Sequence, residues 1–139
     1  MNKDLEAVQY AKIIYNNWVD AMTCPKNDIH RVLELYHPNA ILIPTFSPVI
    51  CITEDQRYAY FKNLISLPTL AISTEELIST ECNKVIVNSG LYTFSYVSSS
   101  SNRQVTVPAR FSFVYKNFDG CWLIVSHHSS VLPIQATSF

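Results

Sequence analysis

The sequence predicts an α+β domain in which helices pack on one face of an antiparallel sheet. Through the first half of the chain, apolar residues recur at three- and four-residue spacing, which indicates amphipathic helices. From about residue 70 this period disappears, and long runs rich in Val, Ile, Thr, Tyr and Phe follow, separated by short turn signals. Helices first and a meander of strands afterwards favour a single helical layer against the sheet.

Two helices are expected before residue 40. The first covers residues 3–22 and has one apolar stripe, made of Leu5, Val8, Ala11, Ile14, Tyr15, Trp18 and Met22. A short second helix, capped by Asn27 or Asp28, is expected to hold Ile29 through Tyr36 and to end at Pro38.

The next segment combines a strand, a loop and a third helix. Residues 40–44 form a short apolar run that is typical of a strand, and Pro44 and Pro48 then predict a loop of defined shape. Thr53 and Gln56 fit a capping box, in which each side chain bonds the other residue's backbone amide. The third helix follows this box and ends at Pro68.

Four long strands are expected in the second half, joined by hairpins into an antiparallel sheet. They cover residues 72–81, 84–97, 104–116 and 121–130. Asp119-Gly120 is a strong hairpin signal for the last turn. If the sheet curls around the first helix, a pocket forms between the two.

Composition limits the possible functions. The 139 residues suit one domain, residues 1–139, and only 15% of them are charged, where about 25% is usual. We therefore expect a homo-oligomer, a poorly soluble monomer being the alternative. The net charge of -1 builds no basic face for nucleic acid, and no apolar run is long enough to span a membrane. The N-terminal residues do not resemble a secretory signal, which favours the cytoplasm.

Neither a metal nor a nucleotide cofactor is expected. The four cysteines are scattered, without the clustered spacing of a zinc site, and are expected to be free, buried thiols. Only two glycines occur in the chain, so there is no glycine-rich loop to hold the phosphates of ATP.

Several segments carry a resemblance to a known family. They are ILIPTFSPVI from Ile41, RYAYFKNLIS from Arg57, SGLYTFSY from Ser89, VPARFSFVYKNFDGCWLIV from Val107 and SHHSSVLP from Ser126. Together they resemble small stand-alone bacterial proteins similar to the association domain of calcium/calmodulin-dependent protein kinase II, in the NTF2-like superfamily and its SnoaL-like or DUF4440-like group. This resemblance implies a cone-shaped fold, self-association through the sheet, no kinase activity, and a pocket between sheet and helices that can take small carboxylates.

Arg110 is the first candidate ligand-binding residue. It lies among alternating apolar residues in an expected central strand, where an unpaired guanidinium is costly to bury. Its partner is either a small organic anion in the pocket or a helix carboxylate such as Asp20 or Glu34. Arg57 begins the third helix, where the kinase hub has a pocket histidine by resemblance, and a solvated helix residue is the alternative.

The last strand supplies the other candidates. His127 and His128 are adjacent and must point to opposite faces of the sheet. By the family's register, we expect His127 and Ser129 to face the pocket together with Arg110, Ser112 and Tyr92. His128 is expected to be either a second pocket residue or a hydrogen-bonded residue at a dimer interface.

Three functions remain open from the sequence. The first is a self-associating module that binds a small organic anion beside Arg110. The second is an isomerase or hydrolase of the SnoaL-like or ketosteroid-isomerase-like type, using His127 with Asp20 or Tyr92. The third is an oligomerisation domain with no working pocket. The central strands contain no carboxylate for acid–base catalysis, which weighs against the enzyme.

Overall fold

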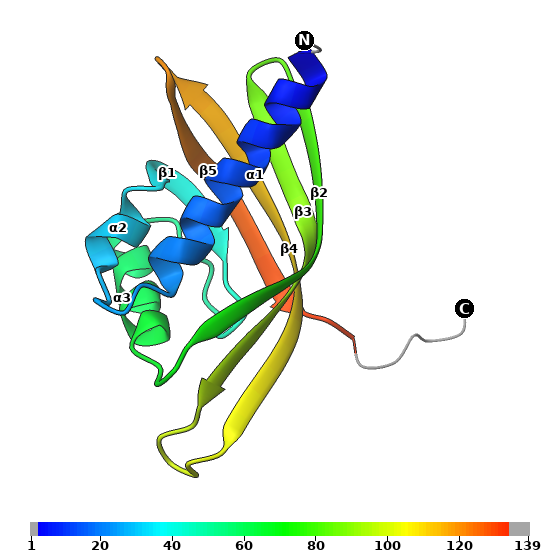
Figure 1. Cartoon of the computed structure of the whole chain (residues 1–139). Helices are drawn as coiled ribbons and strands as arrows, with labels where there is room; N and C mark the ends of the chain where they lie inside the picture. Colours follow the sequence, from blue (N-terminus) through cyan, green and yellow to red (C-terminus); the bar gives the residue numbers. More distant parts are fainter. Residues whose placement is uncertain (1–2, 134–139) are drawn as a thin grey trace.

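The computed structural model describes residues 3–133, and the side chains of residues 9–133. It contains three helices, α1 (Lys3–Met22), α2 (Ile29–Leu33) and α3 (Glu54–Ile65), and five strands, β1 (Tyr36–Ile43), β2 (Ala71–Cys82), β3 (Val85–Val97), β4 (Gln104–Phe118) and β5 (Cys121–Val131). Figure 1 shows the helices together on one side of a bent sheet, and none of the described helices covers the other face. The predicted α+β class is confirmed. No helix in the described range has both the length and the apolarity needed to cross a bilayer.

The sheet has the strand order β1-β5-β4-β3-β2. The last four strands of the chain form an antiparallel meander, as the hairpin signals predicted. β1 is different because it pairs with β5 in parallel, Tyr36 lying opposite Ile124. The prediction that Tyr36 belongs to the second helix is wrong, because Leu35 already accepts a backbone hydrogen bond from Ile124 at 2.9 Å. This pairing to the end of the chain draws the segment into the sheet.

Local capping signals account for the starts of α2 and α3. The side chain of Asp28 accepts hydrogen bonds from the backbone amides of His30 and Arg31. Thr53 and Gln56 form the predicted capping box at the start of α3. Gln56 Oε1 also accepts from the backbone amide of Ile52 at 2.7 Å, which ties the preceding loop to the helix.

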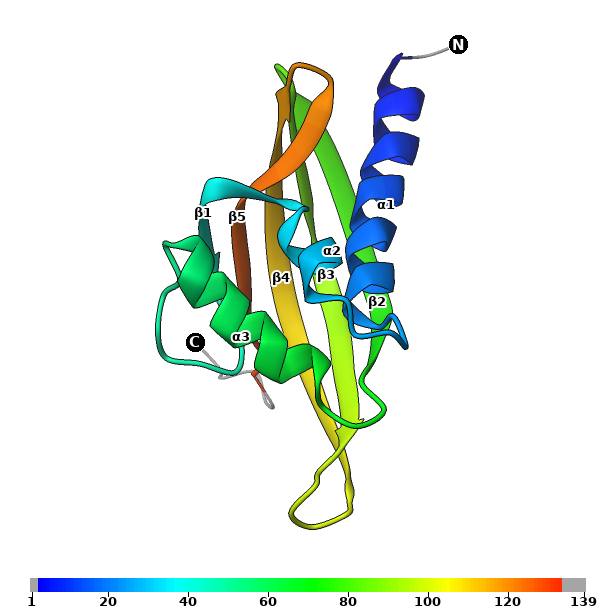
Figure 2. The same cartoon turned by 90° about the vertical axis from the view of Figure 1, so that its left-hand side faces the viewer.

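The core lies between α1 and the inner face of the sheet. Figure 2 views the molecule from the side of the sheet that carries the helices. The apolar stripe predicted for the first helix is buried at Ala11, Ile14, Tyr15, Trp18 and Met22, while the side chains of Leu5 and Val8 lie outside the described residues. Inward aromatic rings of β3 and β4 pack on this stripe. Trp18 stacks on Tyr92 at 5.8 Å and meets Phe113 edge-on at 5.0 Å.

Gly90 allows a bulge that bends the outer part of the sheet. The register between β2 and β3 shifts between Thr74 and Glu76, and a Cβ atom on Gly90 would lie only 1.9 Å from the Glu76 carbonyl oxygen. No residue with a side chain fits this approach without a backbone movement. The bulge keeps Thr74 on the inner side, where its hydroxyl bonds Tyr15 Oη at 2.7 Å.

Candidate functional site

A hydrogen-bonded polar cluster lies in the core beneath α1. His127 is 2% exposed, and its Nδ1 lies 2.8 Å from Tyr36 Oη while its Nε2 lies 3.3 Å from Tyr92 Oη. Tyr92 donates to Ser129 Oγ at 2.6 Å, and the Ser129 hydroxyl bonds the hydroxyl of Thr45. The structure thus places Tyr92, His127 and Ser129 together on the inner face of the sheet.

The donors and acceptors of this cluster can be assigned in order. Trp18 Nε1 donates to Tyr36 Oη at 3.0 Å, which leaves the Tyr36 hydrogen for Nδ1 of His127. Since Tyr92 donates to Ser129, its oxygen accepts from Nε2–H of His127. His127 is therefore the Nε2–H tautomer, with both ring nitrogens bonded. Burial, and to a smaller degree the nearby His128, lowers its pKa to about 3, so the ring is uncharged at neutral pH.

This arrangement supports the structure more directly than it supports catalysis. The ring of Phe113 stacks on His127 at 3.8 Å, and Trp18 covers it edge-on at 5.3 Å, so a ligand would have to displace these rings to reach it. Asp20, the acid proposed to pair with His127, is exposed. The pair that the isomerase or hydrolase alternative needs is formed with Tyr92 and not with Asp20.

Arg57 is buried, so the alternative that it is a solvated helix residue is wrong. Its side chain is 1% exposed. It donates to three backbone carbonyl oxygens of β1, those of Ala40 at 2.6 Å, Pro38 at 2.9 Å and His37 at 3.3 Å. Desolvation lowers its pKa, and Glu54 opposes this shift. The guanidinium fastens α3 to an irregular stretch of β1 whose carbonyls lack ladder partners.

Arg110 does not share the inner face, so the predicted grouping of Arg110 with Tyr92 and His127 is wrong. Ala109 lies opposite Tyr92 in the sheet, and strand alternation turns Arg110 to the outer face, where it is exposed. Its Nε donates to Ser130 Oγ at 3.3 Å. His128 lies on this face too, and Arg110 and His128 border one shallow hollow of about 210 Å³ with Ser112 and Ser130.

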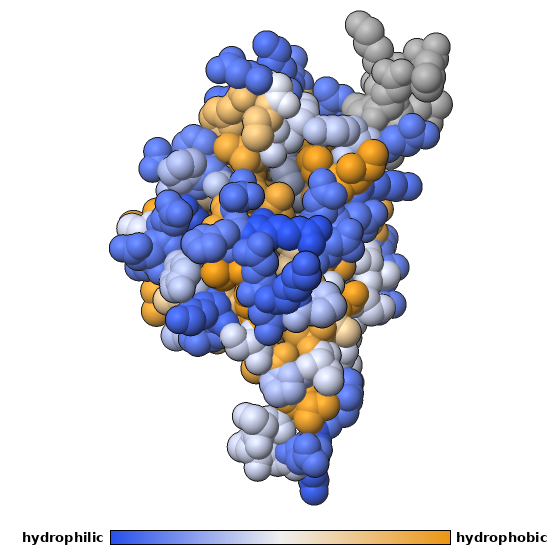
Figure 3. All heavy atoms as spheres, turned by 60° about the vertical axis from the view of Figure 1, so that its left-hand side comes forward, coloured by the Kyte–Doolittle hydropathy of each residue, from blue (hydrophilic) through white to orange (hydrophobic). Residues whose placement is uncertain are grey.

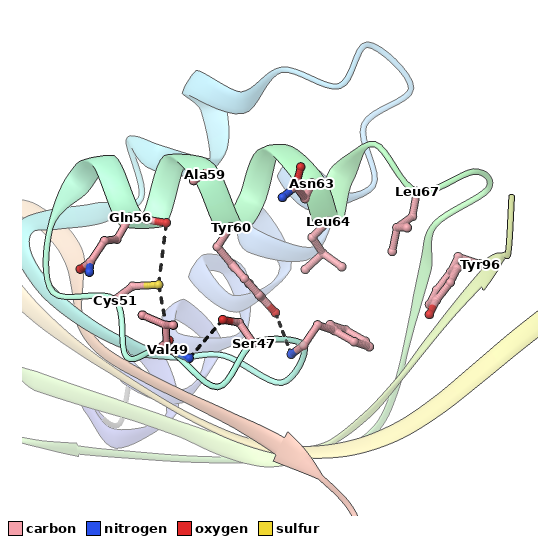
Figure 4. A pocket seen from close by; sticks show the side chains of 11 residues that line it. Ser47, Val49, Cys51, Gln56, Ala59, Tyr60, Asn63, Leu64, Leu67 and Tyr96 are labelled. Carbon is pink, nitrogen blue, oxygen red and sulfur yellow. Dashed lines mark hydrogen bonds between the residues drawn. The ribbon is translucent and has the colours of Figure 1, made fainter. Parts of the chain in front are cut away.

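A larger cleft lies elsewhere, between α3, the loop at residues 44–53 and the end of β3. Its volume is about 540 Å³, and Figure 4 shows Tyr60 and Leu64 of α3 facing the loop, with Tyr96 at the far end. Sequence reasoning did not find this cleft. The two prolines of the loop and the aromatic side chain at Tyr60 were its only local signals, because its walls come together through contacts distant in the chain.

The thiols and acids of the described range form no metal centre. Residues 3–133 contain no group of three or more His, Cys, Asp or Glu side chains placed to hold an ion. All four cysteines are free, but only Cys51 is buried, and Cys82 and Cys121 are exposed. The expectation that the thiols are buried therefore holds for one residue and fails for these two.

Comparisons with known proteins identify relatives across almost the whole chain. The sequence profile described as calcium/calmodulin dependent protein kinase II association domain matches residues 9–133. A search among curated protein sequences finds no significant match. A crystal structure from Xanthomonas campestris, described as an association domain of this kinase type, is 28% identical with a TM-score of 0.82, over 91% of this chain and 88% of that one.

Two more distant structures share the fold. An NTF2-like superfamily protein from Salmonella enterica has a TM-score of 0.81 at 15% identity, covering 94% of both chains. The association domain of the C. elegans kinase has a TM-score of 0.73 at 14% identity, covering 94% of this chain and 99% of that one. At these identities the likeness shows the NTF2-like cone fold, which agrees with the fold expected from the sequence.

Proposed function

Because the chain belongs to the calcium/calmodulin-dependent protein kinase II association domain family, we propose that it is a self-associating module that pairs through the outer face of its sheet. The family description supports self-association in general. The side chains on the outer face of the sheet support this face as the one that pairs.

Two rows of outward side chains carry the proposal. Cross-strand pairing aligns Ile41, Ser126, Val114, Val87 and Thr80 in one row across the sheet, and Ile43, His128, Ser112, Ser89 and Ile78 in the next. None of these ten residues is Asp, Glu, Lys or Arg, although the solvent-facing side chains of an antiparallel sheet are normally polar. The core of a protein–protein interface is typically depleted of charged residues, and its rim is polar.

The border of this outer face has the charges expected of a rim. Arg110 and Glu76 lie in the row on one side, separated by Leu91, and Lys116 lies in the row on the other side. In a two-fold dimer the same patch meets itself, so border charges of opposite sign can pair between copies. Ile78 is 61% exposed and Ile41 is 47% exposed, and a partner copy would cover both.

The first prediction concerns the mass of the protein in solution. Wild type should sediment as a dimer or larger homo-oligomer. Ile78→Glu should weaken its association by at least about tenfold, because the carboxylates would be desolvated at the interface. Ile13→Glu is the matched control, since Ile13 is a similarly exposed isoleucine on α1, at 54%. A monomeric wild type at tens of micromolar, or equal effects of the two changes, would contradict the proposal.

A second candidate function, binding of a small organic anion, is favoured by the outer hollow. Arg110 and His128 border it together with two serine hydroxyls, which gives a cation and neutral donors on one small surface. The nearest outward acid in its row, Glu76, is separated from Arg110 by a whole strand. The anion proposed from the sequence thus has a candidate site on the outer face instead of the inner one.

The second prediction tests this anion site by thermal unfolding with a panel of small carboxylates, phosphates and neutral analogues. A ligand at about 100 times its Kd adds about 2.7 kcal/mol, which raises Tm by several degrees. The rise should be lost in Arg110→Gln and kept in Arg103→Gln, which changes an exposed arginine in the β3–β4 hairpin. If the anions raise Tm in neither wild type nor Arg103→Gln, and Arg110→Gln has a lower Tm than wild type without any ligand, Arg110 has a structural role alone.

A further inference from the structure

The cleft beside α3 differs in chemistry from the hollow beside Arg110. It has more than twice the volume, at about 540 Å³ against 210 Å³, which is within the usual range for small-molecule sites. None of the side chains that line it carries a charge at neutral pH. Three aromatic rings, those of Phe46, Tyr60 and Tyr96, form much of its wall, and Leu64 and Leu67 continue the apolar surface.

Hydroxyl groups supply the polar part of this cleft. Tyr60 Oη accepts a hydrogen bond from the backbone amide of Phe46 at 3.4 Å, which leaves its own hydrogen to donate. Burial raises the pKa of Tyr60 to about 12, so this group is a neutral donor at physiological pH. Ser47 Oγ accepts from the amide of Val49 at 3.1 Å and also keeps its hydrogen. Figure 4 shows both hydroxyls on the loop side of the cleft.

The buried thiol of the cleft favours binding over covalent chemistry. Cys51 is 3% exposed, and desolvation raises its pKa, although Arg57 opposes the shift. The sulfur lies 3.9 Å from the Val49 carbonyl oxygen and 3.8 Å from that of Gln56, so the thiol hydrogen has weak acceptors nearby. A protonated, bonded thiol is a poor nucleophile.

The walls of the cleft are held in place before any ligand arrives. Leu42 and Cys51 exchange two backbone hydrogen bonds of 2.9 Å, which close the base of the loop. The ring of Phe46 meets Phe94 edge-on at 5.2 Å, which anchors the loop to the sheet. A preformed site loses little conformational entropy on binding. In Figure 3, hydrophobic side chains also reach the surface just above the narrow hairpin tip of the molecule.

We propose that this cleft binds an uncharged, mainly apolar ring compound that carries an oxygen hydrogen-bond acceptor. The aromatic and aliphatic walls would cover the ring, and the hydroxyl groups of Tyr60 and Ser47 would donate to the oxygen. A charged ligand would be desolvated there without an opposite charge, which is strongly unfavourable. This inference goes beyond the proposed self-association and does not depend on it, because the cleft lies on the helical side of the sheet.

Three probes with the same ring system test the ligand class: methyl naphthyl ketone, naphthalene and naphthoate. Binding is measured by isothermal titration or by ligand-observed NMR on the full chain, in the oligomeric state in which it is purified. The ketone should bind most tightly, with naphthalene weaker by about threefold to tenfold for lack of the acceptor and naphthoate weaker by at least about tenfold.

Two variants locate the site, and a third serves as the control. Ala59→Trp places a large ring at an exposed position of α3 that lines the cleft, and should abolish binding of the ketone. Lys62→Trp adds the same ring at an exposed α3 position outside the lining, and should leave binding unchanged. Tyr60→Phe should reduce the preference for the ketone over naphthalene, because it removes one of the two donors, while naphthalene still binds.

Three results would overturn the proposal. They are no binding of any probe at millimolar concentration, naphthoate binding as tightly as the ketone, or equal affinities in Ala59→Trp and Lys62→Trp. Melting curves of the variants without probe show whether each one is folded, so that lost binding is not confused with unfolding. The mass of the protein, measured in the same samples, separates failure of this site from failure of the self-association proposal.

Discussion

At the scale of single residues, His127 shows how burial can take the charge from a side chain that sequence reasoning selects as an acid or base. Its pKa is lowered to about 3 by desolvation, and its two hydrogen bonds, from Tyr36 and to Tyr92, suit the neutral ring. The hydroxyl groups of both tyrosines have pKa values raised well above their usual range by burial. Neither tyrosine ionises near neutral pH, so the network has one protonation state there.

The third prediction is a pH dependence of stability. In the unfolded state, His127 binds a proton below about pH 6.5, whereas in the folded state it binds one only near pH 3. The stability that the neutral His127 ring contributes is therefore fully present above pH 6.5 and is lost as the pH falls toward 3. The slope from this residue approaches about 1.4 kcal/mol per pH unit. Urea unfolding between pH 7 and pH 4.5 should show a smaller slope in His127→Gln than in wild type, within the window where His127 titrates.

His128→Gln is the matched control for this pH series. His128 is the neighbouring histidine and is exposed on the outer face, so its removal should leave most of the slope in place. Equal slopes in all three proteins would mean that His127 gains its proton in the folded state, through an opening of the core that the structure does not show.

At the scale of elements, the bend between β2 and β3 depends on one glycine. The Glu76 carbonyl oxygen occupies the place of a side chain at Gly90, whereas a Cβ on Gly120 would meet nothing within 4 Å. Gly120 is needed for another reason, its φ of +91° in the β4–β5 hairpin. The chain therefore needs its two glycines for different physical reasons, a steric one at Gly90 and a conformational one at Gly120.

The fourth prediction compares alanine substitutions at these glycines. Gly90→Ala should destabilise the fold by about 2–4 kcal/mol, because the β-bulge must shift to make room for the methyl group. Gly120→Ala should cost about 1–2 kcal/mol, the usual penalty for a left-handed backbone conformation. Denaturant unfolding measures both, and a smaller effect at Gly90 than at Gly120 would show that the bulge relaxes easily.

At the scale of the whole molecule, the two faces of the sheet have different surroundings. The inner face is closed by α1 and its aromatic packing, so most of its side chains are already buried in one copy of the chain. The outer face carries the two uncharged rows of side chains, and no helix within residues 3–133 covers it (Figure 1). A second copy would supply the missing layer, as expected for a chain with a low content of charged residues.

The fifth prediction links this layer to stability. If association stabilises the fold, Tm must rise with protein concentration, by the equivalent of about 2.7 kcal/mol per dimer over a hundredfold range. Differential scanning fluorimetry should show this rise in wild type and in Ile13→Glu, and a smaller rise in Ile78→Glu. A Tm that does not change with concentration in wild type would mean that the copies, if they associate, gain no stability from it.

The local pattern of the sequence was enough to place α1, α3 and the four strands of the meander. Each of these depends on interactions within a few residues, such as the capping box at Thr53 or the hairpin at Asp119-Gly120, so a short window contains the necessary information. The resemblance in the later strands likewise pointed to the family that the comparisons show. The inward position of His127 followed from strand alternation once the register was assumed.

Long-range contacts account for the rest. β1 pairs with β5 across about 90 residues of sequence. This pairing places Tyr36 in the sheet and positions the backbone carbonyls to which the buried Arg57 donates. Arg110 faces outward because its two neighbours on β4, Ala109 and Phe111, take the inner positions, where apolar side chains fill the core better than a guanidinium can. The cleft at Tyr60 exists only where a helix, a loop and a strand end meet, and no local pattern specifies such a meeting.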